Sequence, residues 1–329
     1  MKIVIPGGTG QVGSFLARAM HAAGHEVVVL SRRAAPAPWR VTEWDGRTVG
    51  AWADELAGID VLINLAGRSV NCRYHQANRR EIMDSRVDST RVLGQAMAET
   101  GCAPRVWLQS STATIYAHRY DAANDESTGI LGGDEPNAPD TWRFSIDVAK
   151  AWERAAEEAV PTGTRLVKLR SAMIMSPDAG GVFDTLLRLV RFGLGGRAGD
   201  GRQYMSWIHF ADFVRAIDWL IDHDTVAGNV NLAAPNPLPN AQFMQALRRA
   251  WGIPFGLPAN RWMLEIGTAL MRSESELVLK SRRVVPGRLQ AEGFRFDFPD
   301  WPTAAQDLCR RWREGDHAFT PQGRLAGVH

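Results

Sequence analysis

Three glycines near the start of the chain, Gly7, Gly10 and Gly13, have a spacing suited to holding a phosphate. They follow the apolar run KIVIP and open a segment with a helical pattern. A side chain at the first glycine would hinder a tight turn. At the second it would block a pyrophosphate from the backbone amides, and at the third it would push the helix off the strand. The N-terminus of the helix would add partial positive charge to such a site.

Glycine turns between strands and helices are common, so the loop alone is weak evidence for a ligand. Its position in the first strand–turn–helix unit of a plausible parallel sheet favours dinucleotide binding over a purely structural turn. The residues expected to contact the dinucleotide here are Gly7, Thr9, Gly10, Gln11, Val12 and Gly13.

The end of the second strand, VVVLSRR, indicates which dinucleotide is bound. NAD sites usually place Asp or Glu at this point, where it binds the ribose 2′-hydroxyl. Here Ser31, Arg32 and Arg33 take that place, and a hydroxyl with two cations suits a 2′-phosphate. One or both arginines could instead be solvated loop residues, Arg33 being the weaker candidate. We therefore predict NADP(H) in preference to NAD(H), with Ser31 and Arg32 as contacts.

Short β-rich runs alternate with longer helical patterns over the first 170 residues. The expected strands are KIVIP, EVVVL, WRVTEW, DVLINLAG, RVWLQS and TRLVKLR, and the expected helices cover residues 11–23, 51–56, 78–100 and 141–160. Continuous apolar strands that alternate with helices are typical of parallel strands covered on both faces. The fold class expected is therefore α/β, with a Rossmann-type doubly wound parallel sheet.

The pattern loosens after residue 170, which suggests a second, smaller unit. We expect residues 1–170 to form the dinucleotide-binding domain, with a strand at 229–234 returning to its sheet. Residues 171–228 and 235–315 are expected to form a small, mostly helical substrate lobe, and residues 316–329 a tail. The run PNPLPN, with its prolines and asparagines, marks the boundary before the last helical part.

Composition and charge exclude several classes of function. The chain has 329 residues, 45% of them hydrophobic, and a net charge of +2. A nucleic-acid partner is not expected, because this charge is close to neutral. Its apolar runs are too short to span a bilayer, so no membrane partner is expected. Cys72, Cys102 and Cys309 are scattered and suggest reduced thiols in the cytoplasm. No His, Cys and Asp cluster has the spacing of a metal site.

The motifs GGTGQVG, NLAG and SSTATIY resemble the short-chain dehydrogenase/reductase superfamily in its extended, NAD-dependent epimerase/dehydratase-like branch. The segments GDGRQYMSWIHFADFVRAI and RRVVPGRLQAEGFRF resemble an atypical subgroup often labelled "epimerase family protein", with a DUF1731-like C-terminal segment. The resemblance covers nearly the whole chain. It implies that Leu65, Ala66 and Gly67 line the cofactor, that Asp45 lies beside the adenine, and that Arg86 lies near the cofactor. Asp45 as a turn residue and Arg86 in a surface salt bridge are the alternatives.

The resemblance also shows what is missing. Extended members usually pair a Ser or Thr with a Tyr-x-x-x-Lys motif on the next helix, where the lysine lowers the pKa of the tyrosine. Thr112 occupies the hydroxyl position, but alignment on the following WE pair puts Ser145 and Ala149 in place of the tyrosine and lysine. Lys150 is one residue out of register, and one residue turns a helical side chain by about 100°.

Histidine could move a proton in place of the missing tyrosine, because it titrates near neutral pH. His75 lies in the loop after the fourth strand and is a second candidate catalytic residue, whereas His209 is expected to make a structural hydrogen bond. The sequence thus favours an NADP(H)-dependent oxidoreductase or epimerase-like enzyme with an unknown small-molecule substrate. The alternative is a non-catalytic NADP(H)-binding redox sensor or regulatory protein, and either could form a homodimer.

Overall fold

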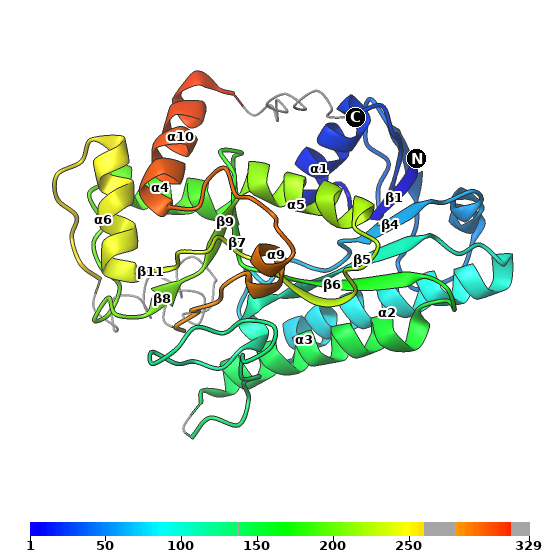
Figure 1. Cartoon of the computed structure of the whole chain (residues 1–329), viewed down its shortest axis with the longest axis horizontal. Coiled ribbons are helices and arrows are strands. Elements are labelled where there is room, and N and C mark those ends of the chain that lie inside the picture. The colour runs from blue at the N-terminus through cyan, green and yellow to red at the C-terminus, as the bar shows by residue number, and fades with distance from the viewer. Residues whose placement is uncertain (137, 260–279, 317–329) are drawn as a thin grey trace.

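The computed structural model describes residues 1–136, 138–259 and 280–316, and its centre is a seven-stranded parallel sheet (Figure 1). The strand order is β10-β6-β5-β4-β1-β2-β3. Its strands are β1 (Lys2–Pro6), β2 (Glu26–Ser31), β3 (Arg40–Glu43), β4 (Val61–Asn64), β5 (Val106–Thr112), β6 (Arg165–Ser171) and β10 (Gly228–Leu232). This arrangement confirms the Rossmann-type doubly wound sheet that the sequence predicts.

The strands form the centre of the sheet because they are apolar on both faces. Ile3, Val4 and Ile5 in β1 have no exposed surface, and neither do the four residues of β4. Parallel strands buried on both sides read as continuous hydrophobic runs. β10 pairs in parallel with β6, so a segment from late in the chain closes one edge of the sheet.

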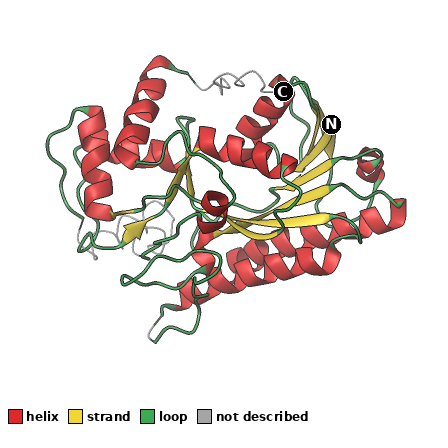
Figure 2. Ribbon diagram, viewed as in Figure 1, coloured by secondary structure: helices red, strands yellow, loops and turns green. Residues whose placement is uncertain are grey.

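Helices cover both faces of this sheet (Figure 2). The longer helices are α1 (Gln11–Ala22), α2 (Gln76–Thr100), α3 (Asp140–Ala159) and α5 (Phe210–Asp222), and 3-10 turns occupy Ala51–Leu56 and Ala113–Ile115. α2 and α3 pack side by side beneath the sheet, with α1 and α5 on the other face (Figure 1). Phe15 of α1 meets Phe210 and Phe213 of α5 edge-on, with ring centroids 6.0 Å apart in each pair.

A smaller region lies beside the sheet and holds the remaining elements. Its helices are α4 (Val182–Arg191), α6 (Asn240–Trp251) and α10 (Trp301–Glu314), with the short α9 (Gly287–Ala291) nearer the sheet. β7 (Met173–Met175) pairs with β9 (Trp207–His209), and β8 (Tyr204–Met205) pairs with β11 (Leu238–Pro239). Trp301 stacks on Phe243 at 3.9 Å and joins α10 to α6.

The division of the chain into domains at residue 170 stays a prediction. α5 falls in the segment assigned to the smaller lobe, yet it packs against α1 on the sheet. Within the described ranges, no helix is both long and apolar enough to cross a membrane. Those ranges also hold no group of three or more His, Cys, Asp or Glu residues placed to bind a metal ion.

Candidate functional site

The strand order reverses between β1 and β4, and the loops that follow these two strands touch. Gly7 has φ +79°, in the left-handed region that favours glycine. A Cβ at Gly7 would lie 2.8 Å from the nitrogen of Ala66 and from the oxygen of Leu65. Gly7 therefore serves both the turn and the close approach of the two loops, at the crevice where doubly wound folds bind ligands.

Gly10 differs from its neighbours because it faces open space. A Cβ there would meet only the Gly7 oxygen, at 3.5 Å. At Gly13, by contrast, it would lie 2.4 Å from the Cα of Gly8. Gly13 thus allows α1 to pack closely against the glycine loop, and not against the strand as the spacing argument expected. Gly8, which the spacing argument did not include, is the residue that meets the strand, because its Cβ would lie 2.7 Å from the Val29 side chain.

The side chain of Gln11 is held by a distant loop. Its Nε2 donates to the carbonyl oxygen of Asp178 at 3.3 Å, and a Cβ at Gly181 would lie 2.1 Å from the same nitrogen. Val12 is partly buried and packs against the main hydrophobic core. The backbone amides of both residues lie in the first turn of α1, which provides no intrahelical acceptor for them.

The end of β2 carries the residues expected to select the dinucleotide. The Ser31 hydroxyl lies 3.0 Å from that of Thr9 in the glycine loop, and the Arg33 amide donates to it at 3.4 Å. Arg32 is exposed. The Ser31 hydroxyl is therefore tied to the glycine loop, while the Arg32 side chain is exposed to solvent.

Asp45 acts as a turn residue in this structure. Its carboxylate accepts hydrogen bonds from the amides of Arg47 and Thr48, at 2.8 and 2.9 Å, and from the Thr48 hydroxyl at 2.7 Å. These bonds, those to Thr48 first, lower the pKa of the carboxyl below its usual value. The geometry favours the alternative given for this residue, and a contact with the adenine stays a prediction.

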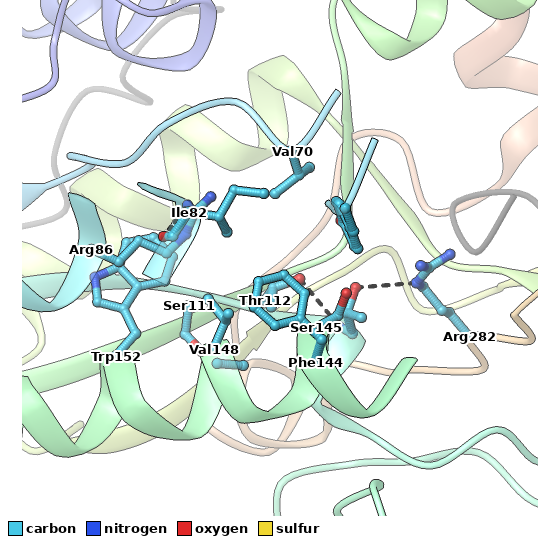
Figure 3. Close-up of a pocket in the computed structure, with 13 residues that line it drawn as sticks. Val70, Ile82, Arg86, Ser111, Thr112, Phe144, Ser145, Val148, Trp152 and Arg282 are labelled. Atoms are coloured by element: carbon cyan, nitrogen blue, oxygen red, sulfur yellow. Dashed lines mark hydrogen bonds between the residues drawn. The ribbon is translucent and has the colours of Figure 1, made fainter. Parts of the chain in front are cut away.

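A cavity of about 210 Å³ opens at the carboxyl end of β5, between α2 and α3 (Figure 3). Its lining is Val70, Tyr74, Ile82, Arg86, Ser111, Thr112, Thr114, Phe144, Ser145, Val148, Ala149, Trp152 and Arg282. Lys150 is not among these residues, because its Nζ donates to the Gly132 oxygen at 3.0 Å. The register derived from the sequence therefore agrees with the structure: Ser145 and Ala149 face the cavity and the lysine does not.

Arg86 is a half-buried cation in the cavity wall. Its Nη1 donates to the Ile82 oxygen at 3.0 Å, and its guanidinium lies 5.0 Å from the Trp152 ring centroid. Within the described ranges no carboxylate pairs with it, so the surface salt bridge given as the alternative is wrong. Burial lowers its pKa to about 10, so it stays charged at neutral pH. A Cβ at Gly67 would lie 3.2 Å from this side chain, which links the loop after β4 to the cavity.

The structure places neither histidine in the cavity. His75 is exposed at the N-terminus of α2, where its Nδ1 accepts from the Asn78 amide, and the neighbouring Tyr74 faces the cavity instead. A catalytic role for His75 therefore has no geometric basis. His209 is fully buried and lies 3.2 Å from Asp307. Its role is structural, with a partner on α10.

A buried polar network fixes α3 against the sheet. Glu153 of α3 accepts two hydrogen bonds from Arg170 of β6, both at 2.9 Å, and one from Ser111 of β5 at 2.6 Å. Arg170 also donates to the Tyr116 oxygen at 3.0 Å, and Tyr116 donates to Asn231 of β10 at 2.9 Å. Burial raises the pKa of Tyr116. Its hydroxyl is held by Asn231 and Arg170, and Tyr116 is not part of the cavity lining, so this phenol is a structural group.

Sequence reasoning missed the part of the site that comes from residues 280–285. Lys280 donates to the Thr114 oxygen at 2.8 Å, and Arg282 donates through Nε to the Thr114 hydroxyl at 3.2 Å. Arg282 begins a motif that carried the family resemblance and Lys280 lies just before it, but no local signal places either residue at the end of β5. Tyr74, Phe144 and Trp152 were also missed, because aromatic residues at helical spacing are more often core residues.

A parallel sheet with a glycine loop at the point where its strand order reverses defines a dinucleotide-binding protein of the Rossmann class. The family model described as "NAD dependent epimerase/dehydratase family" matches residues 3–233, and "Domain of unknown function (DUF1731)" matches residues 261–308. This chain belongs to the NAD dependent epimerase/dehydratase family, as an atypical short-chain dehydrogenase/reductase of the epimerase-family type.

Individual relatives support the same assignment. The mouse epimerase family protein SDR39U1 is 31% identical over 313 residues, which cover 94% of this chain and 99% of that protein. The crystal structure of human SDR39U1 (isoform 2) with NADPH superposes with a TM-score of 0.79 at 28% identity, covering 94% of this chain and 99% of that one. MoeE5 in complex with UDP-glucuronic acid and NAD shares the fold, with a TM-score of 0.71 at 18% identity over 94% of this chain and 99% of its own. Similar folds thus hold either dinucleotide.

Proposed function

We propose that this protein is an NADPH-dependent oxidoreductase that reduces a small carbonyl compound. The observation that carries the proposal is one cavity lined by Thr112, Ser145 and Arg86, which the loop after β4 connects to the glycine loop. Contacts connect the two places, since Gly7 touches the loop after β4 and Gly67 of that loop touches Arg86.

The residues present fit a dinucleotide. The space at Gly10 and the amides at the start of α1 suit a pyrophosphate, which backbone donors at a helix N-terminus attract. The end of β2 offers Arg32 and no carboxylate, which suits the 2′-phosphate of NADPH better than the 2′-hydroxyl of NADH. NADPH in the crystal structure of human SDR39U1 supports this preference.

Bound NADPH would supply a hydride to the carbonyl carbon, so that residues of this chain would have to supply a proton to the carbonyl oxygen. The Thr112 hydroxyl can donate a hydrogen bond to that oxygen and pass a proton to it from water. Ser145 lines the same cavity but takes no such role in this proposal. Arg86 brings a positive charge into the cavity from which the lysine of the usual pair is missing. The walls formed by Tyr74 and Phe144 exclude water from one side.

The loss of the Tyr-x-x-x-Lys pair favours one other function. Ser145 is a much weaker acid than tyrosine, and Ala149 places no cation one turn along the helix. An NADP(H)-binding protein without turnover, serving as a redox sensor or regulatory partner, would need only the glycine loop and the end of β2.

Titration calorimetry with NADPH and NADH tests the cofactor, and oxidation of NADPH by a panel of aldehydes and ketones tests the reaction. We expect NADPH to bind more tightly, and Arg32→Ala to weaken NADPH about tenfold to a hundredfold, as for the loss of one charge-assisted hydrogen bond. Arg33→Ala is the matched control and should have a smaller effect. Equal affinities of the unaltered protein for the two dinucleotides would refute the 2′-phosphate assignment. Tight NADPH binding without turnover of any carbonyl would favour the sensor.

A further inference from the structure

The loop that joins β7 to α4 touches the first residue of α1. We call this loop, residues 176–181, the strap. Gln11 of α1 donates through Nε2 to the carbonyl oxygen of Asp178 in the strap, at 3.3 Å. We propose that the strap holds the dinucleotide in its site, and that the contact with Gln11 slows its release. The inference rests on the proposed function only in naming the dinucleotide as the ligand.

The contact lies where a pyrophosphate is expected. α1 begins at Gln11 with Gly10 as its N-cap, and the first turn of a helix leaves its amides without an intrahelical acceptor. These amides and the open space at Gly10 suit a pyrophosphate. Gln11 therefore offers its backbone to the dinucleotide and its side chain to the strap. A pyrophosphate bound to this amide would lie within one residue of the strap.

The strap is anchored at both ends and exposed in its middle. Met175, which ends β7, and Phe183, in the first turn of α4, have no exposed surface and belong to the main hydrophobic core. Ala179 and Gly180 are exposed, and a Cβ at Gly180 would meet no atom within 4 Å. The Gly180 amide donates to the Asp184 carboxylate at 2.9 Å. A short segment with few contacts between buried anchors can open locally while the fold stays intact.

Gly181 allows the strap to approach Gln11 closely. The three atoms nearest to a Cβ at Gly181 would all belong to the Gln11 side chain, the farthest of them 2.8 Å away. Gly181 has φ −83° and ψ 178°, a conformation that any residue adopts. Gly181→Ala would therefore displace the Gln11 amide group without straining the backbone. The contact can thus be broken from either side, at Gln11 or at Gly181.

The position of the strap explains why it should affect release more than chemistry. It borders the space at the start of α1, and none of its residues is among those that line the cavity. β7 pairs with β9, so the strap also connects the glycine loop to the smaller region of the fold. Opening of such a loop often sets the rate at which a ligand leaves.

Stopped-flow displacement of bound NADPH by excess NADP⁺, followed by NADPH fluorescence, measures the dissociation rate. We expect Gln11→Ala to raise this rate about fivefold, as for the loss of one hydrogen bond between neutral groups. Gly181→Ala should raise it to a similar extent. The double variant should release NADPH no faster than either single variant, because both substitutions break the same contact.

Val182→Ala is the control, since it shortens the side chain next to Gly181, which is 42% exposed, and should leave the rate unchanged. An increase in Gln11→Ala without one in Gly181→Ala would overturn the proposal, because the glutamine would then act on the dinucleotide directly. Unchanged rates in both single variants, or additive effects in the double variant, would also overturn it. Failure of NADPH to bind the unaltered protein would contradict both proposals, whereas NADPH binding without turnover of any carbonyl would count against the proposed function alone.

Discussion

Replacing Arg86 with methionine should make the unliganded protein more stable, although it removes a hydrogen bond. The guanidinium is charged and half-buried, and no carboxylate pairs with it within the described ranges. A fall in pKa from 12.5 to about 10 corresponds to an unfavourable burial of about 3 kcal/mol for the charged form at pH 7. Methionine keeps much of the apolar stem and carries no charge.

Two favourable contacts offset part of this gain. The hydrogen bond to the Ile82 oxygen is worth about 1 kcal/mol. The guanidinium over the Trp152 ring is worth about 0.5–1 kcal/mol. We therefore expect Arg86→Met to raise the free energy of unfolding by about 1–2 kcal/mol while weakening the binding of NADPH.

Arg170→Met provides the contrast, because that arginine has a partner. Burial alone would lower the pKa of Arg170, but the carboxylate of Glu153 outweighs burial and raises it. Removing the cation leaves Glu153 buried with the Ser111 hydroxyl as a hydrogen-bond donor and, within the described ranges, the Lys168 ammonium 3.9 Å away as its nearest cation. The loss of one partner of a buried pair costs about 3–5 kcal/mol.

Urea unfolding at pH 7, followed by circular dichroism, measures both changes, and an unchanged m-value confirms a change in stability rather than in the unfolded state. Replacing arginine with methionine should therefore raise the urea midpoint at position 86 and lower it at position 170. A loss of more than about 1 kcal/mol in Arg86→Met would refute the reasoning, because the cation would then gain more from its contacts than burial costs it.

The remaining predictions concern the glycine loop and the cavity. Gly10→Val should abolish NADPH binding in calorimetry with little change in melting temperature, because the valine side chain enters open space. Gly13→Ala should lower the urea midpoint, because the new Cβ would lie 2.4 Å from the backbone of Gly8. Once a carbonyl substrate is found, Thr112→Ala should lower kcat/KM about a hundredfold, Ser145→Ala should cost little, and Lys150→Ala should leave turnover unchanged. A collapse of turnover in Lys150→Ala would show that the lysine acts in the site.

Local patterns were sufficient to predict much of the fold and part of the site. The apolar strands, the glycine loop and the register of α3 depend on residues a few positions apart, whose periodicity is visible in the sequence. The prediction that Ala149 and not Lys150 faces the cavity combined an alignment to the family motif on Trp152 and Glu153 with the 100° turn per helical residue. The return of a strand at 229–234 to the sheet was also predicted, and the structure has it as β10 over Gly228–Leu232, paired with β6.

Side-chain partners far apart in the sequence could not be predicted in this way. His75 and Tyr74 are neighbours in one loop, and only the start of α2 decides that the tyrosine turns inward. The pairing of His209 with Asp307 joins residues 98 positions apart. The position of Arg282 depends on two hydrogen bonds of its backbone, one to Tyr204 of β8 and one to Ser206, the residue after β8. No spacing in the sequence reveals these bonds.

The separation of Arg282 from the dinucleotide loops has a consequence for how this fold can diversify. The glycine loop and the end of β2 lie within the first 31 residues, whereas the cation at the far end of the cavity comes from a segment that another family model describes. Substitutions in the later segment therefore change the cavity wall at Arg282 without altering the glycine loop. Exchange of residues 280–285 between relatives would test whether this wall and the glycine loop can vary independently in one chain.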